Sequence, residues 1–216
     1  MKNRNIVKML VELMERNNPD LIYICLNFLK KLSVFGQNKN DMIEYDIVKW
    51  MNRFVPCQNP LLTHIALWLL FNLSFDPEIW QWISAIGMIP KLVELLKVAQ
   101  YWSILLRILY HLSSEDKIKN TFAYTSCIPL VYQLIIHFPD QVIGKELIAF
   151  AINLTTDPKC AEIISSNDQL EPLIDRAFKT YDTLLFRVCR NIAQFGPVTN
   201  VDIYEKYMPL YIELAQ

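Results

Sequence analysis

Apolar side chains recur at helical spacing along the chain and are interrupted by short polar turns. The clearest stretch is Tyr101–Leu112, where apolar residues one, four, five and eight positions apart predict one buried helix face. Residues 113–116 are Ser-Ser-Glu-Asp and favour a cap and a turn. A short helix to Tyr124 is expected next, then Ser126 as an N-cap. Ile128-Pro129 opens another helix, because proline fits the first helical turn.

A short signature closes each long helix. Its copies are Leu29-Lys30-Lys31-Leu32-Ser33, Phe71-Asn72-Leu73-Ser74, Tyr110-His111-Leu112-Ser113, Ile152-Asn153-Leu154-Thr155 and Arg190-Asn191-Ile192-Ala193. The last residue stands at 33, 74, 113, 155 and 193, so the steps are 41, 39, 42 and 38. A period near forty indicates stacked helical repeats, and three helices per period favour armadillo over HEAT repeats. The sequence therefore predicts an all-α, armadillo-repeat superhelical solenoid.

The repeats set the expected domain organisation, which is a single armadillo domain over residues 1–216. We expect about four full repeats of a short, a medium and a long helix. Their boundaries are a partial repeat 1–34, repeats 35–74, 75–113, 114–155 and 156–193, and a partial repeat 194–216. Medium helices are expected at both ends, around Ile6–Arg16 and at Met208–Ala215. Their apolar faces fit a segment of a longer array, a shortened relative, or ends that meet a partner.

The medium helices are aligned by their distance from the signature. Ile89-Pro90, Ile128-Pro129 and Met208-Pro209 each begin fifteen residues after it. In the 156–193 repeat Leu170 takes that place, with Glu171 instead of proline. In the 35–74 repeat the alignment puts Ile47 first and Val48 in the place of the proline.

Bulk composition excludes several classes of protein. The chain has 216 residues, 53% of them hydrophobic, and a net charge of −1, which gives no overall attraction to nucleic acid or to an acidic membrane. The four glycines form no phosphate-binding motif, and the five cysteines are scattered singly, which predicts free thiols in a reducing compartment. No signal peptide is visible, and the longest apolar run, Ile65–Phe71, is too short for a bilayer. We expect a soluble, intracellular protein without membrane insertion.

No catalytic or metal-binding motif is present. The histidines His64, His111 and His137 fall in three different repeats, without a partner at ligand spacing. We therefore predict no enzyme activity, no cofactor and no metal site. Exposed tryptophan is enriched in binding hot spots, so Trp50, Trp80, Trp82 and Trp102 are candidate anchors, with Trp82 first to test.

The candidate binding site lies along the long helices. The signature position and those four and eight residues before it share one helix face, which in an armadillo array lines the inner groove. The candidate protein-binding groove consists of Tyr23, Asn27, Lys31, His64, Trp68, Asn72, Arg107, His111, Lys145, Asn153, Arg187 and Asn191, and Ser103, Ala149 and Thr183 complete the register. Four of these residues are cationic and none is acidic, which favours an acidic extended peptide or helix as partner.

Other interpretations of this face stay open. The positions could be ordinary solvated helix faces with a chance excess of one sign, and the asparagines could bond to neighbouring backbone within the stack. Trp68 and Asn72 look like the ladder by which importin-α holds basic signals, but the pair occurs once and a basic ligand would meet a basic wall. A helical nucleic-acid reader is disfavoured because such readers have a strongly positive groove on a basic domain.

Nine short segments, spread from about residue 6 to about residue 212, follow a more specific pattern than the repeat alone. They are Phe28–Ser33, Asn38–Met42, Asp46–Val48, Asn72–Asp76, Leu109–Ser113, Phe122–Thr125, Cys127–Pro129, Ile152–Leu154 and Arg190–Ile192. These segments resemble the armadillo region of the kinesin-associated protein family, whose members are the non-motor subunit of heterotrimeric kinesin-2. Lys31, His111 and the run Phe122–Thr125 are typical of that family and not of armadillo repeats in general.

The resemblance implies a non-catalytic scaffold that binds the C-terminal tails of a kinesin-2 motor pair and links them to cargo adaptors, including those of intraflagellar transport. It also implies a cytoplasmic, microtubule-associated location, which includes the cilium or flagellum. The alternative is a generic armadillo adaptor that binds an acidic peptide in its groove and is unrelated to kinesin.

Overall fold

The structure is a computed structural model, and it describes residues 5–166 and 168–214. Across these residues every regular element is a helix: fifteen α-helices and three short 3-10 helices. The all-α prediction is confirmed. The chain divides into two compact units, unit 1 (Met1–Leu112) and unit 2 (Ser113–Gln216), and the division falls inside the third signature. That residues 1–216 form a single domain stays a prediction.

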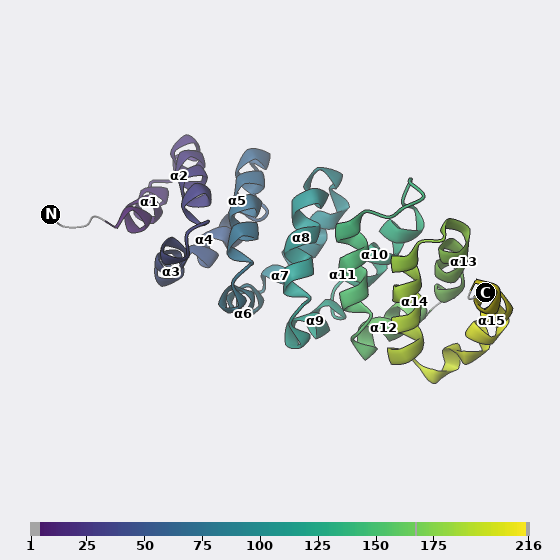
Figure 1. Cartoon of the computed structure of the whole chain (residues 1–216). Coiled ribbons are helices and arrows are strands. Elements are labelled where there is room, and N and C mark those ends of the chain that lie inside the picture. The colour runs from purple at the N-terminus through teal and green to yellow at the C-terminus, as the bar shows by residue number, and fades with distance from the viewer. Residues whose placement is uncertain (1–4, 167, 215–216) are drawn as a thin grey trace. The chain divides into compact units, whose positions relative to one another are not determined.

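Unit 1 begins with two helices that precede the first full repeat, and two repeats of three helices follow (Figure 1). The long helices α2, α5 and α8 pack in that order. The 3-10 turns Leu95–Lys97 and Ala99–Tyr101 connect α7 to α8. The helices are α1 (Ile6–Met14), α2 (Pro19–Leu32), α3 (Gly36–Glu44), α4 (Ile47–Phe54), α5 (Pro60–Leu73), α6 (Pro77–Ala85), α7 (Met88–Glu94) and α8 (Trp102–Leu112).

Unit 2 holds two further repeats and a closing helix. Its long helices α11 and α14 pack against each other. A 3-10 turn, Val198–Asn200, leads into the last helix. The helices are α9 (Asp116–Phe122), α10 (Cys127–Ile136), α11 (Lys145–Leu154), α12 (Pro158–Ser165), α13 (Leu170–Thr180), α14 (Thr183–Phe195) and α15 (Val201–Leu214). Three helices per period are thus observed, although the short and medium helices differ little in length.

Local sequence explains where these helices start. Four of them open with an Asn-Pro or Asp-Pro pair, at Asn18, Asn59, Asp76 and Asp157. The side-chain oxygen accepts from a backbone N–H of the first turn, and proline occupies a position whose N–H would have no helical partner. Ser126 stands at the N-cap position of α10, and the Oγ1 of Thr125 accepts from the Cys127 N–H at 3.1 Å. Ser126 is therefore the N-cap residue as predicted, and the preceding Thr125 supplies the side-chain acceptor for the first N–H of the helix.

Buried small residues end the long helices of the first four signature copies. Ser33, Ser74 and Thr155 are C-caps, and each hydroxyl donates to a carbonyl of the last helical turn. Helix α14 instead continues past Ala193 to Phe195, because alanine has no hydroxyl and favours helix. It ends at Gly196, where an added Cβ would lie 2.5 Å from the Ile192 carbonyl oxygen.

The structure corrects the alignment of two medium helices. Helices α7, α10 and α13 start at Met88, Cys127 and Leu170, so proline is the third helical residue in all three. Pro172, not Glu171, is therefore the equivalent of Pro90. Helix α4 starts at Ile47, which puts Lys49 and not Val48 in that place. The alignment assumed a fixed distance from the signature, and loops that differ by one residue in length shifted the assigned positions.

The prediction that a medium helix begins at Met208 and runs to Ala215 is wrong about where the helix begins. Helix α15 runs without a break from Val201 to Leu214 and contains Pro209, while Ala215 lies outside the described residues. In unit 1 a residue with positive φ separates the short helix from the medium helix, Asp46 at 55° and Gly87 at 66°. No described residue between Val201 and Leu214 has a positive φ, so the helix continues through the proline.

Candidate protein-binding surface

Signature asparagines donate hydrogen bonds to residues of the preceding signature copy. In unit 1 the Asn72 Nδ2 donates to the Lys30 carbonyl at 3.1 Å and to the Ser33 Oγ at 2.9 Å. In unit 2 the Asn153 Nδ2 donates to the Ser113 Oγ at 3.0 Å. The last carbonyls of a helix have no partner within that helix, and the Asn72 amide supplies a donor to one of them at the end of α2.

Asn191 repeats this arrangement in unit 2 and is fully enclosed. Its Nδ2 donates to the Ile152 carbonyl at 3.1 Å and to the Thr155 Oγ1 at 3.3 Å. The residue is only 3% exposed. Its prediction as a groove residue that contacts a ligand is wrong, because the neighbouring repeat covers it. For the amide donors of Asn72, Asn153 and Asn191, bonding within the stack is the observed use.

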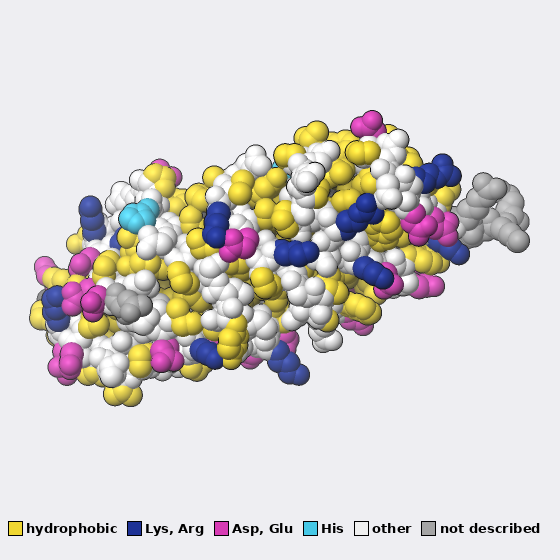
Figure 2. All heavy atoms as spheres, turned by 180° about the vertical axis from the view of Figure 1, so that it is seen from behind, with side chains coloured by type: hydrophobic (Ala, Val, Ile, Leu, Met, Phe, Trp, Pro, Cys, Tyr) yellow, Lys and Arg dark blue, Asp and Glu magenta, His cyan; other side chains and the backbone are white. Residues whose placement is uncertain are grey.

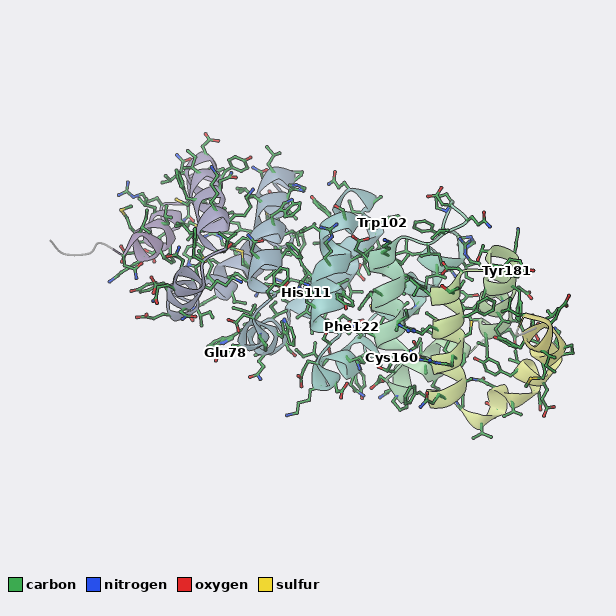
Figure 3. All side chains as sticks on the ribbon, in the orientation of Figure 1. Glu78, Trp102, His111, Phe122, Cys160 and Tyr181 are labelled. Carbon is green, nitrogen blue, oxygen red and sulfur yellow. The ribbon has the colours of Figure 1, made fainter. Side chains whose placement is uncertain are left out.

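His111 occupies the asparagine position of its repeat, near the end of α8 (Figure 3). Its Nδ1 lies 2.8 Å from the Ser74 Oγ, so an imidazole makes the same inter-repeat hydrogen bond. Burial lowers the pKa of His111. The ring is therefore favoured in its neutral form, and it contributes an aromatic surface and no charge at neutral pH.

The earlier positions of the register are more accessible. Tyr23 and His64 are exposed, and Asn27 and Trp68 are half-buried. The Trp68 Nε1 donates to the His64 Nε2 at 3.0 Å, and the Asn27 Nδ2 donates to the Tyr23 carbonyl one turn earlier. These two polar pairs are therefore formed within α5 and within α2.

The four predicted cations all lie exposed on the long helices. Lys31 and Arg107 belong to unit 1, and Lys145 and Arg187 belong to unit 2. The remaining register positions are Ser103 and Thr183, which are exposed, and Ala149, which is half-buried. Each unit thus presents two cations and no carboxylate at these positions. That this basic stripe binds a partner stays a prediction.

Among the candidate tryptophans, Trp82 is the exposed one, at 47%. The indole N–H groups of Trp80 and Trp102 each donate to a carbonyl six residues earlier, Ser74 and Leu96. Trp50 stacks on Phe54 at 6.2 Å between ring centroids, and the Arg53 guanidinium lies over its ring. These three indoles are half-buried and make contacts within the fold, so Trp82 remains the candidate anchor.

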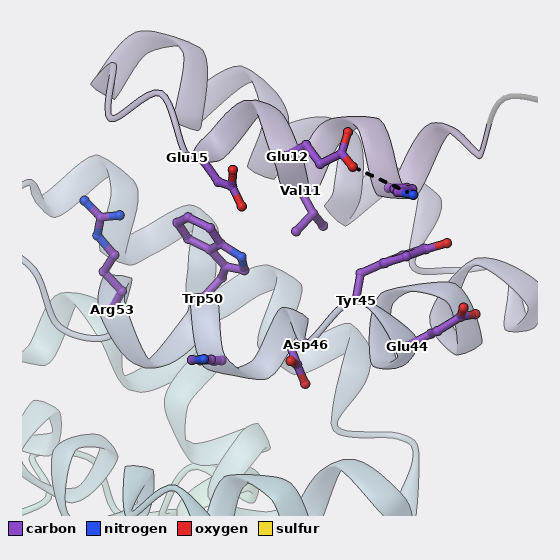
Figure 4. A pocket seen from close by; sticks show the side chains of 10 residues that line it. Val11, Glu12, Glu15, Glu44, Tyr45, Asp46, Trp50 and Arg53 are labelled. Atoms are coloured by element: carbon purple, nitrogen blue, oxygen red, sulfur yellow. Dashed lines mark ion pairs between the residues drawn. The ribbon is translucent and has the colours of Figure 1, made fainter.

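The sequence analysis did not foresee a cleft of about 630 Å³ that α1 forms with the α3–α4 corner (Figure 4). Trp50 and Tyr45 lie in one wall of the cleft, and Glu12 and Glu15 lie in the other. Its charged lining residues are Lys8, Glu12, Glu15, Glu44, Asp46, Lys49 and Arg53. Because its lining contains three cations and four carboxylates, the cleft has no strong preference for a ligand of either charge. The face drawn in Figure 2 likewise mixes cations, anions and apolar side chains.

Metal binding, thiol reactivity and membrane insertion each place a physical requirement on the described residues. No group of three or more His, Cys, Asp or Glu side chains in this part of the chain could hold a metal ion. Burial raises the pKa of the Cys160 and Cys189 thiols to about 12, which keeps them protonated and unreactive. In the same residues no single helix is long and apolar enough to span a membrane, and only the bent pair Pro77–Ala85 with Met88–Lys97 meets that length and composition together.

Comparison with known proteins gives the same architecture. The family model of the kinesin-associated protein (KAP) matches residues 1–209. A designed armadillo repeat protein superposes with a TM-score of 0.72 at 14% identity, covering 93% of this chain and 87% of its own. Computationally designed armadillo repeat proteins for modular peptide recognition give 0.71 at 12% identity, with coverages of 86% and 80%. A structure concerned with the interaction between cadherin and beta-catenin gives 0.72 at 15% identity, with coverages of 86% and 38%. The armadillo fold is confirmed.

Proposed function

Because this chain belongs to the kinesin-associated protein family, whose role is non-catalytic protein binding, we propose that it is an adaptor for kinesin-2 motors. It binds the C-terminal tails of a motor pair and links them to cargo adaptors. Its place of action is the microtubule, including microtubules of the cilium or flagellum. The family match over residues 1–209 is the observation that carries this proposal.

The basic stripe of each unit is the proposed contact surface. Lys31, Arg107, Lys145 and Arg187 are exposed on the long helices, and no carboxylate shares their register. Complementary charge steers encounter and fixes the register of a partner more than it adds affinity. An acidic stretch of a motor tail or of a cargo adaptor fits this surface, with a stronger effect on association rate than on final stability.

Co-purification from the native cell tests the adaptor role. Two motor heavy chains should appear with this protein in stoichiometric amount. If the protein is recovered with a different complex and without motor chains, the kinesin-2 proposal is wrong, and the generic armadillo adaptor takes its place.

Charge reversal tests the surface. Arg187→Glu in unit 2 should weaken binding of the motor tails about three- to tenfold at low salt, because an exposed ion pair contributes up to about 1 kcal/mol and reversal adds repulsion. Lys117→Glu, which changes an exposed cation of α9 outside the stripe, is the matched control. Equal affinity and equal salt dependence for Arg187→Glu and wild type would refute the stripe as the contact surface.

A further inference from the structure

Unit 1 carries a continuous chain of aromatic ring contacts along α5 and α8 and the residues next to their ends, which we call the aromatic ridge. It begins at Tyr101 and His64, whose ring centroids are 6.5 Å apart, and continues to Trp68 at 6.4 Å. The further steps are Trp68–Phe71 at 6.0 Å, Phe71–Phe75 at 5.1 Å, Phe71–His111 at 5.6 Å, Phe75–His111 at 4.5 Å and Tyr110–His111 at 5.9 Å.

Helix spacing explains why the rings meet. His64, Trp68 and Phe71 follow one face of α5 at steps of four and three residues, and Phe75 comes just after the helix end. Helix α8 packs against α5 and brings in His111. Eleven residues at about 1.5 Å each give a ridge about 16 Å long.

The far end of the ridge is open to solvent. Phe75 is 59% exposed and Tyr110 is 39% exposed, while Phe71 and His111 are half-buried beneath them. Single exposed apolar residues are normal on a protein surface, but a contiguous group of rings marks an interaction site. The depressed pKa of His111, caused by burial, keeps the centre of the group uncharged.

A lysine lies beside the open end of the ridge. The Lys39 Nζ lies 5.7 Å from the centroid of the Phe75 ring. The neighbouring carboxylate, Asp76, caps α6 by accepting from the Glu78 N–H at 3.0 Å. A ligand carboxylate placed next to a ligand ring could thus pair with Lys39 while the ring packs on Phe75.

We propose that the aromatic ridge is the docking site for an extended acidic segment that carries an aromatic anchor residue. The proposal rests on the proposed adaptor function and specifies the partner chemistry of unit 1. About five extended residues cover the ridge, because each spans roughly 3.3 Å. Alternate side chains of such a segment face the rings, and an acidic residue next to the aromatic anchor pairs with Lys39.

A defined peptide probe tests this proposal. The probe is a fluorescein-labelled nonapeptide with one central Phe and four Asp or Glu residues on each side, and binding to the full chain is measured by anisotropy. Phe75→Ala should weaken binding about tenfold or more, as expected for truncation of an aromatic hot spot. Lys39→Glu should weaken it about three- to fivefold and reduce its salt dependence. Phe35→Ala, which removes an exposed phenylalanine outside the ridge, should leave binding unchanged.

The outcomes separate this proposal from the adaptor function. Equal binding by wild type and Phe75→Ala, or by the peptide with its Phe replaced by Ala, overturns the ridge proposal. Phe75→Lys repeats the test with a polar residue at a solvent-exposed position, in case Phe75→Ala fails to fold. A polyuridine oligonucleotide that binds with the same Phe75 dependence would also overturn it, in favour of base stacking. If the Phe75→Ala protein still co-purifies with the motor chains, the adaptor function stands. If the wild-type protein does not co-purify with motor chains, the adaptor function is wrong, and the peptide result still decides the ridge proposal.

Discussion

Replacement of Asn191 by alanine is the sharpest test of the stacking arrangement. The side chain is 3% exposed, and its amide donates to the Ile152 carbonyl and the Thr155 Oγ1 of the preceding long helix. A hydrogen bond contributes about 1 kcal/mol net, so Asn191→Ala should lower the free energy of unfolding by about 2 kcal/mol. The Thr155 hydroxyl keeps its bonds to Ala151 and Ile152, which holds the cost near that value.

The measurement is thermal unfolding followed by far-ultraviolet circular dichroism. For a chain of this size, 1 kcal/mol shifts Tm by about 2–4 °C, so Asn191→Ala should lower it by about 4–8 °C. Asn27→Ala is the control, because its amide bonds only to the Tyr23 carbonyl of its own helix and the change should stay within about 0.5 kcal/mol.

A charged variant of Asn191 sharpens the same test. Asn191→Asp should also destabilise the chain, because the carboxylate oxygen that replaces the amide nitrogen would face the Ile152 carbonyl without a donor. The other oxygen would keep its donor, the Arg190 Nη2, which lies 3.2 Å from the Asn191 Oδ1. Equal Tm values for Asn191→Ala and Asn27→Ala would refute the argument that these asparagines hold the repeats together.

Three further outcomes follow from single residues. Burial lowers the pKa of His111, so its stabilising contribution is present above about pH 6.5 and is lost as the pH falls below that value. The Tm difference between wild type and His111→Asn should therefore shrink between pH 8 and pH 5.5. A constant difference in Tm would contradict this. Ellman's reagent should label the thiol of Cys57 quickly and label the four buried thiols, Cys25, Cys127, Cys160 and Cys189, only in denaturant. Mass spectrometry of the labelled chain identifies the thiol that reacts first, and a buried one would contradict this. Gly87→Ala should cost about 1 kcal/mol because its φ is 66°, whereas Gly36→Ala should be neutral in the same melt, and equal Tm values would refute the strain argument.

Much of the fold could be predicted from local sequence. The signature ending at Ser33, Ser74, Ser113 and Thr155 marks four helix ends correctly, because a small hydroxyl residue can bond to the carbonyls of its own last turn. The period near forty residues likewise predicts three helices per repeat. The errors, at Pro172 and Pro209, arose where a fixed spacing was carried through loops and helix joints of varying geometry.

The candidate site could be predicted only in part. Sequence spacing places Lys31, Lys145 and Arg187 on exposed helix faces, since residues four apart share a face. It could not distinguish them from Asn191, which has the same register and is buried. The amide partners of Asn72 and Asn191 lie about forty positions earlier in the chain, and no local pattern reports how closely two repeats approach.

By itself, the sequence determines the helices, their repeat and the family, because capping, amphipathic spacing and signature residues act over a few positions. Tertiary structure alone decides which polar residues of the shared face are used between layers and which remain available. It also brings Phe71, Phe75 and His111 into contact from two helices. The physical reason is that burial and ring contact depend on the packing of neighbouring layers, which residues far apart in the chain determine together.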